Sequence, residues 1–150
     1  MRPPVPLGVP LALMLALPTV VSAAPPDTGS VLVSVSGLRS AKGQVLACLT
    51  SQAKGFPDCR HDPTARKLAL SASGPVTFRF GGLPPGRYAV ALLHDENDNG
   101  KADMTLMIPR EGFGFSRDAA ARFGPPKFAA AAFAVEGEAV TVAVHMRYIL

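Results

Sequence analysis

Oxygen-bearing side chains occupy alternate positions in one short stretch near the middle of the chain, on both sides of Gly100. Carboxylate, amide and carbonyl oxygens at this spacing wrap a hard cation such as calcium, and a glycine at the sixth place allows the sharp turn that wrapping needs. At the seventh place, Lys101 would contribute its backbone carbonyl. The residues expected to bind calcium are Asp95, Asn97, Asn99, Lys101 and Asp103.

The twelfth place of this pattern predicts weak binding. A regulatory helix-loop-helix site has a bidentate Glu there, whereas this chain has Leu106. Glu111 or Asp118 from the following segment would complete the shell. With two neutral amides among the ligands, we expect a dissociation constant of about 0.1 to 1 mM. The alternative interpretation is a solvated turn without metal, because turns also favour Asn, Asp and Gly.

Other chemistry near this acidic loop has less support. His94 adjoins the loop, but imidazole is a poor calcium ligand, and we expect one ring nitrogen to hold a backbone group while the other faces solvent. Met104 and Met107 would add soft sulfur ligands for copper, although methionines beside a β-sandwich usually belong to its core. Calcium is therefore the expected cofactor.

The residues offer little for catalysis. Ser116 lacks the Gly-x-Ser-x-Gly turn that presents a serine nucleophile. Asp103 and Glu111 would make a glycosidase-type pair if they faced one another, but almost any exported domain offers such a couple. We expect a protein that is not an enzyme, with a hydrolase as the least favoured alternative.

Alternating apolar residues predict the strands that must position the acidic loop. The period of two runs through 31–36, 76–80 and 140–146, and further strands are expected at 44–50 and 87–93. Short strands separated by glycine-containing turns indicate an all-β fold, an antiparallel sandwich whose two sheets share the apolar residues as a core. Segment 62–71 is ambiguous between a helical turn and a strand, and we treat it as a crossing connection.

A long Gly-, Pro- and Phe-rich loop is expected after the acidic loop, over residues 104–130. Prolines and glycines oppose regular structure there, yet Phe113, Phe115, Phe123 and Phe128 are too apolar for a free linker and should pack on the sandwich. Short helical turns are expected at 119–122 and 129–132.

The aromatic part of this loop, residues 112–116, supplies an alternative function. An open apolar groove lined by Phe113, Phe115 and Tyr88 would favour a protein that binds a small ligand or a glycan. A loop packed shut over the sheet would favour a structural or interaction module instead.

The N-terminal segment has the pattern of a secretory signal. Arg2 precedes an apolar run from Leu7 to Val21, and the small side chains of Val21 and Ala23 fit a cleavage site. The run is short and broken by prolines, which disfavours the alternative of an uncleaved membrane anchor. We expect a signal peptide at 1–23, a linker at 24–29 and one periplasmic or secreted domain at 30–150 without a membrane span.

Export also predicts a disulfide between Cys48 and Cys59, the two cysteines of the chain. Closing this loop would stabilise the fold by about 3 kcal/mol. The spacing is wider than that of redox motifs, so we expect a structural staple for the loop that contains Pro57.

Charge argues against nucleic acid as a partner. The net charge is +4, and the basic residues are scattered rather than gathered in a stripe with exposed aromatic rings. An unidentified protein or small ligand of the cell envelope is the expected partner.

Several motifs together carry a resemblance to a known family. The segment 80–90 reads FGGLPPGRYAV and resembles the strand, proline turn and strand of transthyretin-like modules of secreted proteins. The other motifs are HDENDNGKAD at 94–103, IPREGFGFS at 108–116 and FGPPKF at 123–128. From about Val31 to Tyr148 the chain resembles bacterial domain-of-unknown-function family 2141. The resemblance implies an exported immunoglobulin-like or transthyretin-like β-sandwich with no established activity.

Overall fold

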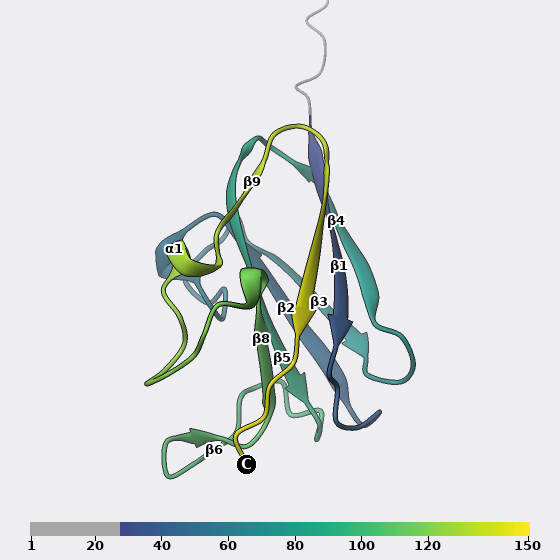
Figure 1. The fold of residues 1–150 in the computed structure, drawn as a ribbon, viewed down its shortest axis with the longest axis vertical. Coiled ribbons are helices and arrows are strands. Elements are labelled where there is room, and N and C mark those ends of the chain that lie inside the picture. Colours follow the sequence, from purple (N-terminus) through teal and green to yellow (C-terminus); the bar gives the residue numbers. More distant parts are fainter. Residues whose placement is uncertain (1–27) are drawn as a thin grey trace, which may run out of the picture.

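The computed structural model describes residues 28–150, and the fold is given for that part of the chain. The expected signal peptide at 1–23 and most of the expected linker at 24–29 lie outside the described residues. Two β-sheets and one short hairpin account for most of the regular structure (Figure 1).

The two sheets form a sandwich. One sheet contains, in order, β10 (Ala139–His145), β1 (Gly29–Ser36) and β4 (Thr77–Leu83). The other contains β3 (Arg66–Ser71), β2 (Gln44–Thr50), β5 (Gly86–Asp95) and β8 (Gly112–Phe115), and β9 (Phe133–Val135) pairs with the start of β5. A separate hairpin joins β6 (Met104–Thr105) to β7 (Ile108–Pro109). The all-β sandwich expected from the sequence is confirmed.

One strand pair runs in a direction that the sequence did not predict. β1 and β10 are parallel, with Val31 opposite Val140 and Val33 opposite Val142, whereas the other strand pairs among residues 28–150 are antiparallel. Side chains alternate between faces with a period of two in either direction, so the pattern reports burial and not strand direction.

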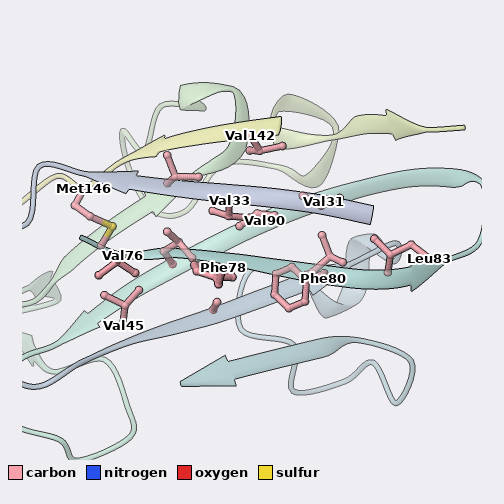
Figure 2. Close-up of a cluster of buried hydrophobic side chains, with 14 of the residues drawn as sticks. Val31, Val33, Val45, Val76, Phe78, Phe80, Leu83, Val90, Val142 and Met146 are labelled. Carbon is pink, nitrogen blue, oxygen red and sulfur yellow. The ribbon is translucent and has the colours of Figure 1, made fainter. Parts of the chain in front are cut away.

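Alternate residues of both sheets form the main core (Figure 2). Val31 and Val33 of β1 and Val90 of β5 are completely buried. Phe78 and Phe80 of β4 pack edge to face, with ring centroids 5.5 Å apart. The apolar face predicted from the alternation is thus the face that the two sheets share.

Segment 62–71, which was expected to be a connection, contains the edge strand β3. Its two leucines follow the strand period, because Leu68 lies opposite Ala47 and Leu70 lies opposite Val45 of β2. The strand is mostly exposed, and two apolar residues were too few to distinguish a strand from a helical turn.

The Phe-rich segment is more regular than the sequence suggested. Residues 112–115 form β8 and hydrogen-bond to β5, so the prediction of an irregular loop over all of 104–130 is wrong. Two glycines permit close approach here: a side chain at Gly112 would collide with the Tyr148 ring, and a Cβ at Gly114 would lie 2.7 Å from Val144. Their role is to admit neighbouring side chains to the strand, not to break it.

The helical turns also differ in part. Helix α1 (Phe128–Ala131) lies close to the turn expected at 129–132, whereas 119–122 is irregular and a 3-10 turn, η2 (Ser116–Asp118), precedes it. No helix within residues 28–150 has the length and apolar character needed to cross a membrane.

A second apolar cluster covers the outer face of the larger sheet. The predicted disulfide between Cys48 and Cys59 is confirmed and lies in this cluster, beside the 3-10 turn η1 (Ala53–Gly55). The Phe56 ring packs 5.7 Å from Phe115 and 6.2 Å from Phe128, measured between ring centroids. Packing of the loop rings is therefore confirmed for Phe115 and Phe128. Phe123, in contrast, is fully exposed.

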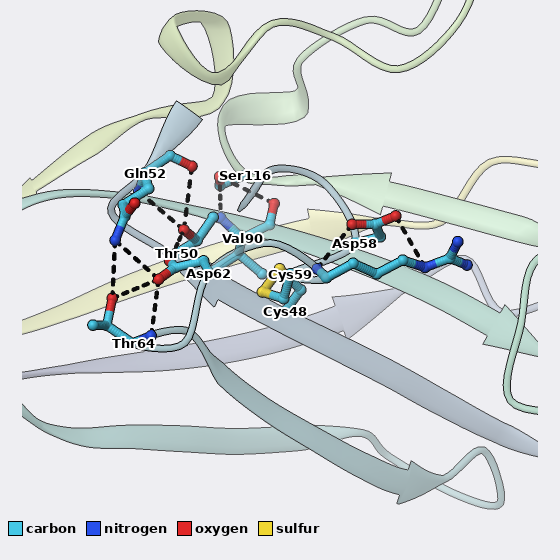
Figure 3. Close-up of a disulfide and its surroundings, with 10 residues drawn as sticks. Cys48, Thr50, Gln52, Asp58, Cys59, Asp62, Thr64, Val90 and Ser116 are labelled. Carbon is cyan, nitrogen blue, oxygen red and sulfur yellow. Dashed lines mark hydrogen bonds and ion pairs between the residues drawn. A yellow bond between two sulfur atoms is a disulfide. The ribbon is translucent and has the colours of Figure 1, made fainter. Parts of the chain in front are cut away.

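The buried Asp62 carboxylate holds together the two ends of the loop that contains Cys59 (Figure 3). Asp62 accepts hydrogen bonds from the Thr50 hydroxyl, from the Gln52 amide at 3.0 Å, and from the Thr64 N–H at 2.9 Å and hydroxyl at 2.6 Å. Burial disfavours the charged form, but the hydrogen bonds from Thr50 and Thr64 outweigh it and lower the pKa of Asp62. The ionised form therefore stabilises the folded chain.

We expect an Asp62→Asn variant to be less stable than the parent by about 1–3 kcal/mol at neutral pH, because an amide leaves at least one buried donor without an acceptor. Since folding lowers the pKa, the carboxylate's contribution is present above its ordinary value of 3.8 and is lost as the pH falls below it. Urea unfolding of both proteins from pH 7 to pH 3 should show the difference shrinking. A constant difference would contradict this role, and Asp58→Asn, at an exposed position, is the matched control.

Candidate functional site

The acidic loop starts where the central strand of the larger sheet ends. Asp95 is the last residue of β5 and lies opposite Gln44 of β2. Glu111 immediately precedes β8, whose first residue, Gly112, lies opposite His94. The strand register therefore brings both Asp95 and Glu111 to the same end of the sheet.

Asp95 holds the loop in its turn. Its carboxylate accepts the backbone N–H of Asn99 at 3.1 Å, the backbone N–H of Gly100 at 2.8 Å and the side-chain amide of Gln44 at 2.9 Å. The residue is completely buried, and these three donors satisfy both of its oxygens. Gly100 has a φ of 76°, a backbone conformation that favours glycine, as the sharp turn of the pattern requires.

The remaining predicted ligands converge on Asp103. The Asn97 amide donates to its carboxylate at 2.7 Å, and the Asn99 amide donates to both of its oxygens at 2.9 Å. These hydrogen bonds, first from Asn99 and then from Asn97, lower the pKa of Asp103. The two asparagine carbonyl oxygens accept backbone N–H groups, Asn97 from Asn99 and Asn99 from Lys101. The structure thus brings these side chains together as a hydrogen-bonded ring.

Glu111 is the least satisfied polar group of the loop. Its Oε2 atom accepts the Asp103 N–H at 3.1 Å, whereas Oε1 is buried and has no hydrogen-bond partner in the described part of the chain. Burial raises the pKa of Glu111, and the charges of Asp95 and Asp103 raise it further, against the opposing effect of the Asp103 N–H. The Glu96 N–H has the smallest effect on this pKa and lies outside hydrogen-bond geometry, so Oε1 has no partner within residues 28–150. A buried acceptor without a donor costs free energy unless something else pairs with it.

Asp118, the other residue expected to complete the shell, lies elsewhere. It follows β8 at the end where Phe115 pairs with Ala91, and it forms an ion pair with Arg147 at 2.6 Å. Leu106, at the twelfth place, is exposed on the β6–β7 hairpin. Within residues 28–150 no three His, Cys, Asp or Glu side chains are already arranged to hold a metal ion.

A polar clamp that the sequence did not reveal fixes the start of the loop. Arg39 donates from Nε and Nη2 to the Glu96 carboxylate, at 3.0 and 2.6 Å, and Nη2 also donates to the Arg110 carbonyl at 3.0 Å. Its guanidinium stacks 4.5 Å from the ring centre of Tyr148 and also binds the carbonyl of Leu150. The hydrogen bonds from Arg39 lower the pKa of Glu96 to about 2. Charged residues this far apart in sequence carry no pairing signal.

His94 has a structural role. It is completely buried, with Nε2 at 2.8 Å from the Lys42 carbonyl and Nδ1 at 2.6 Å from the Tyr148 hydroxyl. A carbonyl only accepts, so Nε2 carries a proton and donates to Lys42, while Nδ1 shares a hydrogen bond with the Tyr148 hydroxyl. The expected bond to a backbone group is present, but the second nitrogen faces Tyr148 instead of solvent. With both nitrogens engaged, His94 has none left for copper, and Met104 and Met107 are exposed rather than part of the core.

Phe113, Phe115 and Tyr88 do not line one groove, which was the arrangement that would have favoured the alternative ligand-binding function. Phe113 and Phe115 lie opposite Leu93 and Ala91 of β5, so their side chains share the outer face of the sheet and contact each other at 5.8 Å. On β5, Tyr88 is an odd number of residues away from Ala91 and Leu93, so its side chain points to the other face of the sheet, towards the core. There its hydroxyl donates to the Pro84 carbonyl at 2.8 Å. Phe113 and Phe115 are therefore packed shut over the sheet.

Ser116, considered above as a nucleophile, is buried, and its hydroxyl is engaged in hydrogen bonds. Its hydroxyl oxygen accepts the Val90 N–H at 2.9 Å, and the hydroxyl lies 2.7 Å from the Ala131 carbonyl, to which it donates. The side chain thus joins β5 to α1 and is not presented to a substrate.

Comparison with known proteins identifies a family but no characterised relative. A family model described as an uncharacterized protein conserved in bacteria, DUF2141, matches residues 33–143. The match runs from β1 into β10 and includes the acidic loop, the β6–β7 hairpin and β8. No curated protein and no solved structure matches the chain. Membership of domain-of-unknown-function family 2141, predicted from the motifs, is confirmed.

The role of Asp95 in holding the loop gives a stability prediction. An Asp95→Asn variant should lose about 1–3 kcal/mol, because its amide group would face donors that need an acceptor. Urea unfolding in EDTA measures the loss without any contribution from metal. Asp98→Asn removes the same charge from an exposed position of the same loop and is expected to change stability by less than about 0.5 kcal/mol. Equal losses in the two variants would show that Asp95 does not hold the loop.

Proposed function

The chain belongs to the DUF2141 family of uncharacterised bacterial proteins, and from that premise we propose that it is an exported, non-catalytic module whose loop at 95–103 binds calcium weakly. Its role in the cell envelope is structural or concerns interaction with a partner. The disulfide between Cys48 and Cys59 supports export, because such bonds persist in oxidising compartments. The buried and fully bonded Ser116 supports a role without catalysis.

The buried, unpartnered Oε1 atom of Glu111 is the observation that carries the calcium proposal. Glu111 is only 4% exposed, and Asp95 and Asp103 lie near enough to raise its pKa through their charges. Buried carboxylates that repel one another are costly to keep ionised without a counter-charge. A hard divalent cation supplies that charge and accepts oxygen ligands alone.

Binding requires a small rearrangement of the two asparagines. As the loop stands, their NH₂ groups donate to the Asp103 carboxylate and stabilise its ionised form. Rotating each amide by half a turn would present its carbonyl oxygen and free the Asp103 carboxylate for the ion. The rotation would also break the hydrogen bonds that these carbonyl oxygens accept from the Asn99 and Lys101 N–H groups. The Lys101 carbonyl and the free oxygen of Glu111 would add ligands, while Asp95 keeps the turn. Because this rearrangement opposes binding, we propose a dissociation constant of about 0.1 to 1 mM.

Calcium should stabilise the folded protein through mass action. At about 10 mM calcium, such an affinity raises the unfolding free energy by about 1.4 to 2.7 kcal/mol. Urea unfolding with calcium, with magnesium and with EDTA measures the effect. Magnesium should stabilise less, because it demands a stricter octahedral geometry than this loop offers.

Two matched double variants localise the effect. Asp103→Asn with Glu111→Gln removes two proposed ligands and should abolish the calcium response. Asp58→Asn with Glu138→Gln removes the same two charges at exposed positions outside the loop and should keep it. A parent protein that calcium leaves unchanged would refute the proposal, as would an equal response in both double variants.

A further inference from the structure

Three large apolar side chains are fully exposed at the tips of two loops. Leu106 and Met107 form the two-residue tip of the β6–β7 hairpin and are 91% and 89% exposed. Phe123, in the loop between η2 and α1, is 107% exposed. In Figure 1 the hairpin and this loop both project beyond the sheets on the left of the view. Side chains of this size at such exposure contribute nothing to the fold of an isolated molecule.

The two residues at the hairpin tip also have a backbone conformation that their residue types disfavour. Leu106 has a φ of 50° and Met107 a φ of 66°, and bulky residues rarely adopt such values. Two-residue hairpin turns with two positive φ angles usually have Asn-Gly or Asp-Gly. A strained turn that presents apolar side chains to solvent suggests that those side chains have a use outside the fold.

The Phe123 loop adds positive charge. Arg122 and Lys127 flank the phenylalanine and are exposed, and no acidic residue occurs from 119 to 132. At the hairpin, Lys101 and Arg110 are exposed as well, but Asp98 and Asp103 offset their charge. The hairpin therefore supplies apolar surface, and the Phe123 loop supplies both apolar surface and positive charge.

We propose that the two tips make a peripheral contact with an anionic lipid surface. Apolar side chains on convex tips can enter the boundary between lipid headgroups and acyl chains, while basic flanks stay beside anionic headgroups. A protein partner would need two separate pockets to receive the same two tips. The contact depends on the exposed side chains and not on calcium, so it can hold or fail independently of the function proposed above.

Sedimentation with lipid vesicles tests the contact. Protein recovered from the periplasm of a bacterial host is mixed, in EDTA, with vesicles of phosphatidylcholine alone or with roughly one third phosphatidylglycerol. It should sediment with the anionic vesicles at about 0.01 M salt and be released towards 0.15 M, because the Debye length falls from about 30 to about 8 Å. No sedimentation with anionic vesicles at low salt would overturn the proposal.

The strained turn provides a variant that separates folding from binding. Leu106→Asn with Met107→Gly places preferred residues in the turn, so the protein should unfold at the same or a higher urea concentration than the parent. Its partition onto anionic vesicles should fall about tenfold or more. Unchanged partition in a folded variant would overturn the proposal. Sedimentation of the parent without vesicles, lost in this variant, would assign the tips to a second copy of the chain and also overturn it.

Charge reversal tests the second loop. Arg122→Glu with Lys127→Glu should lower partition at least tenfold, since each basic side chain near an anionic surface contributes about fivefold. Lys54→Glu with Lys67→Glu makes the same change at exposed positions outside both loops and should reduce partition much less. Equal reductions in both pairs would leave only the net charge as the cause and would refute a contact through these tips.

Discussion

Two carboxylates buried at one end of the larger sheet, those of Asp95 and Glu111, set the structure of the acidic loop. The strand register fixes where they lie, because Asp95 ends β5 and Glu111 precedes β8 beside it. Asp95 is satisfied by the N–H groups of the turn that it holds, whereas one oxygen of Glu111 has no partner among the described residues. Burying negative charge without a partner opposes folding. This imbalance is the physical basis of the calcium proposal.

The rest of the sandwich keeps this end of the sheet in place. The Arg39 clamp joins the loop after β1, the start of the acidic loop and the C-terminal residues. His94 connects the same end of the sheet to Tyr148 and to the Lys42 carbonyl through partly buried hydrogen bonds. The opposite end of the larger sheet is held in place by the disulfide, the second apolar cluster and the hydrogen bonds of Asp62. The Arg39 clamp also holds the Arg110 carbonyl, next to the β6–β7 hairpin whose tip is exposed.

Local patterns predicted most of the fold, and long-range pairings explain most of the errors. Alternation identified the strands that contribute Val31, Phe78 and Val142, because burial on one face imposes a period of two. The disulfide was predictable because the chain has two cysteines and a signal-like N-terminal segment that predicts export to an oxidising compartment. The parallel direction of β10, the close packing that requires Gly112 and Gly114, and the Arg39–Glu96 pair depend on neighbours far away in sequence. In the loop, the spacing predicted that Asn97, Asn99 and Asp103 would converge, but not that amide hydrogens would occupy the place expected for an ion.

Amide chemical shifts measured during a calcium titration test the central claim most directly. In two-dimensional proton–nitrogen spectra, calcium at millimolar concentration should saturably shift the backbone signals of residues 95–103 and of Glu111 and Gly112, together with the side-chain amides of Asn97 and Asn99 as their hydrogen bonds to Asp103 break. Signals at the disulfide end, such as Gln52 and Thr64, should remain in place. Loop signals that stay fixed while others drift without saturation would contradict the account, because they would show that the buried charge of Glu111 is tolerated without a cation.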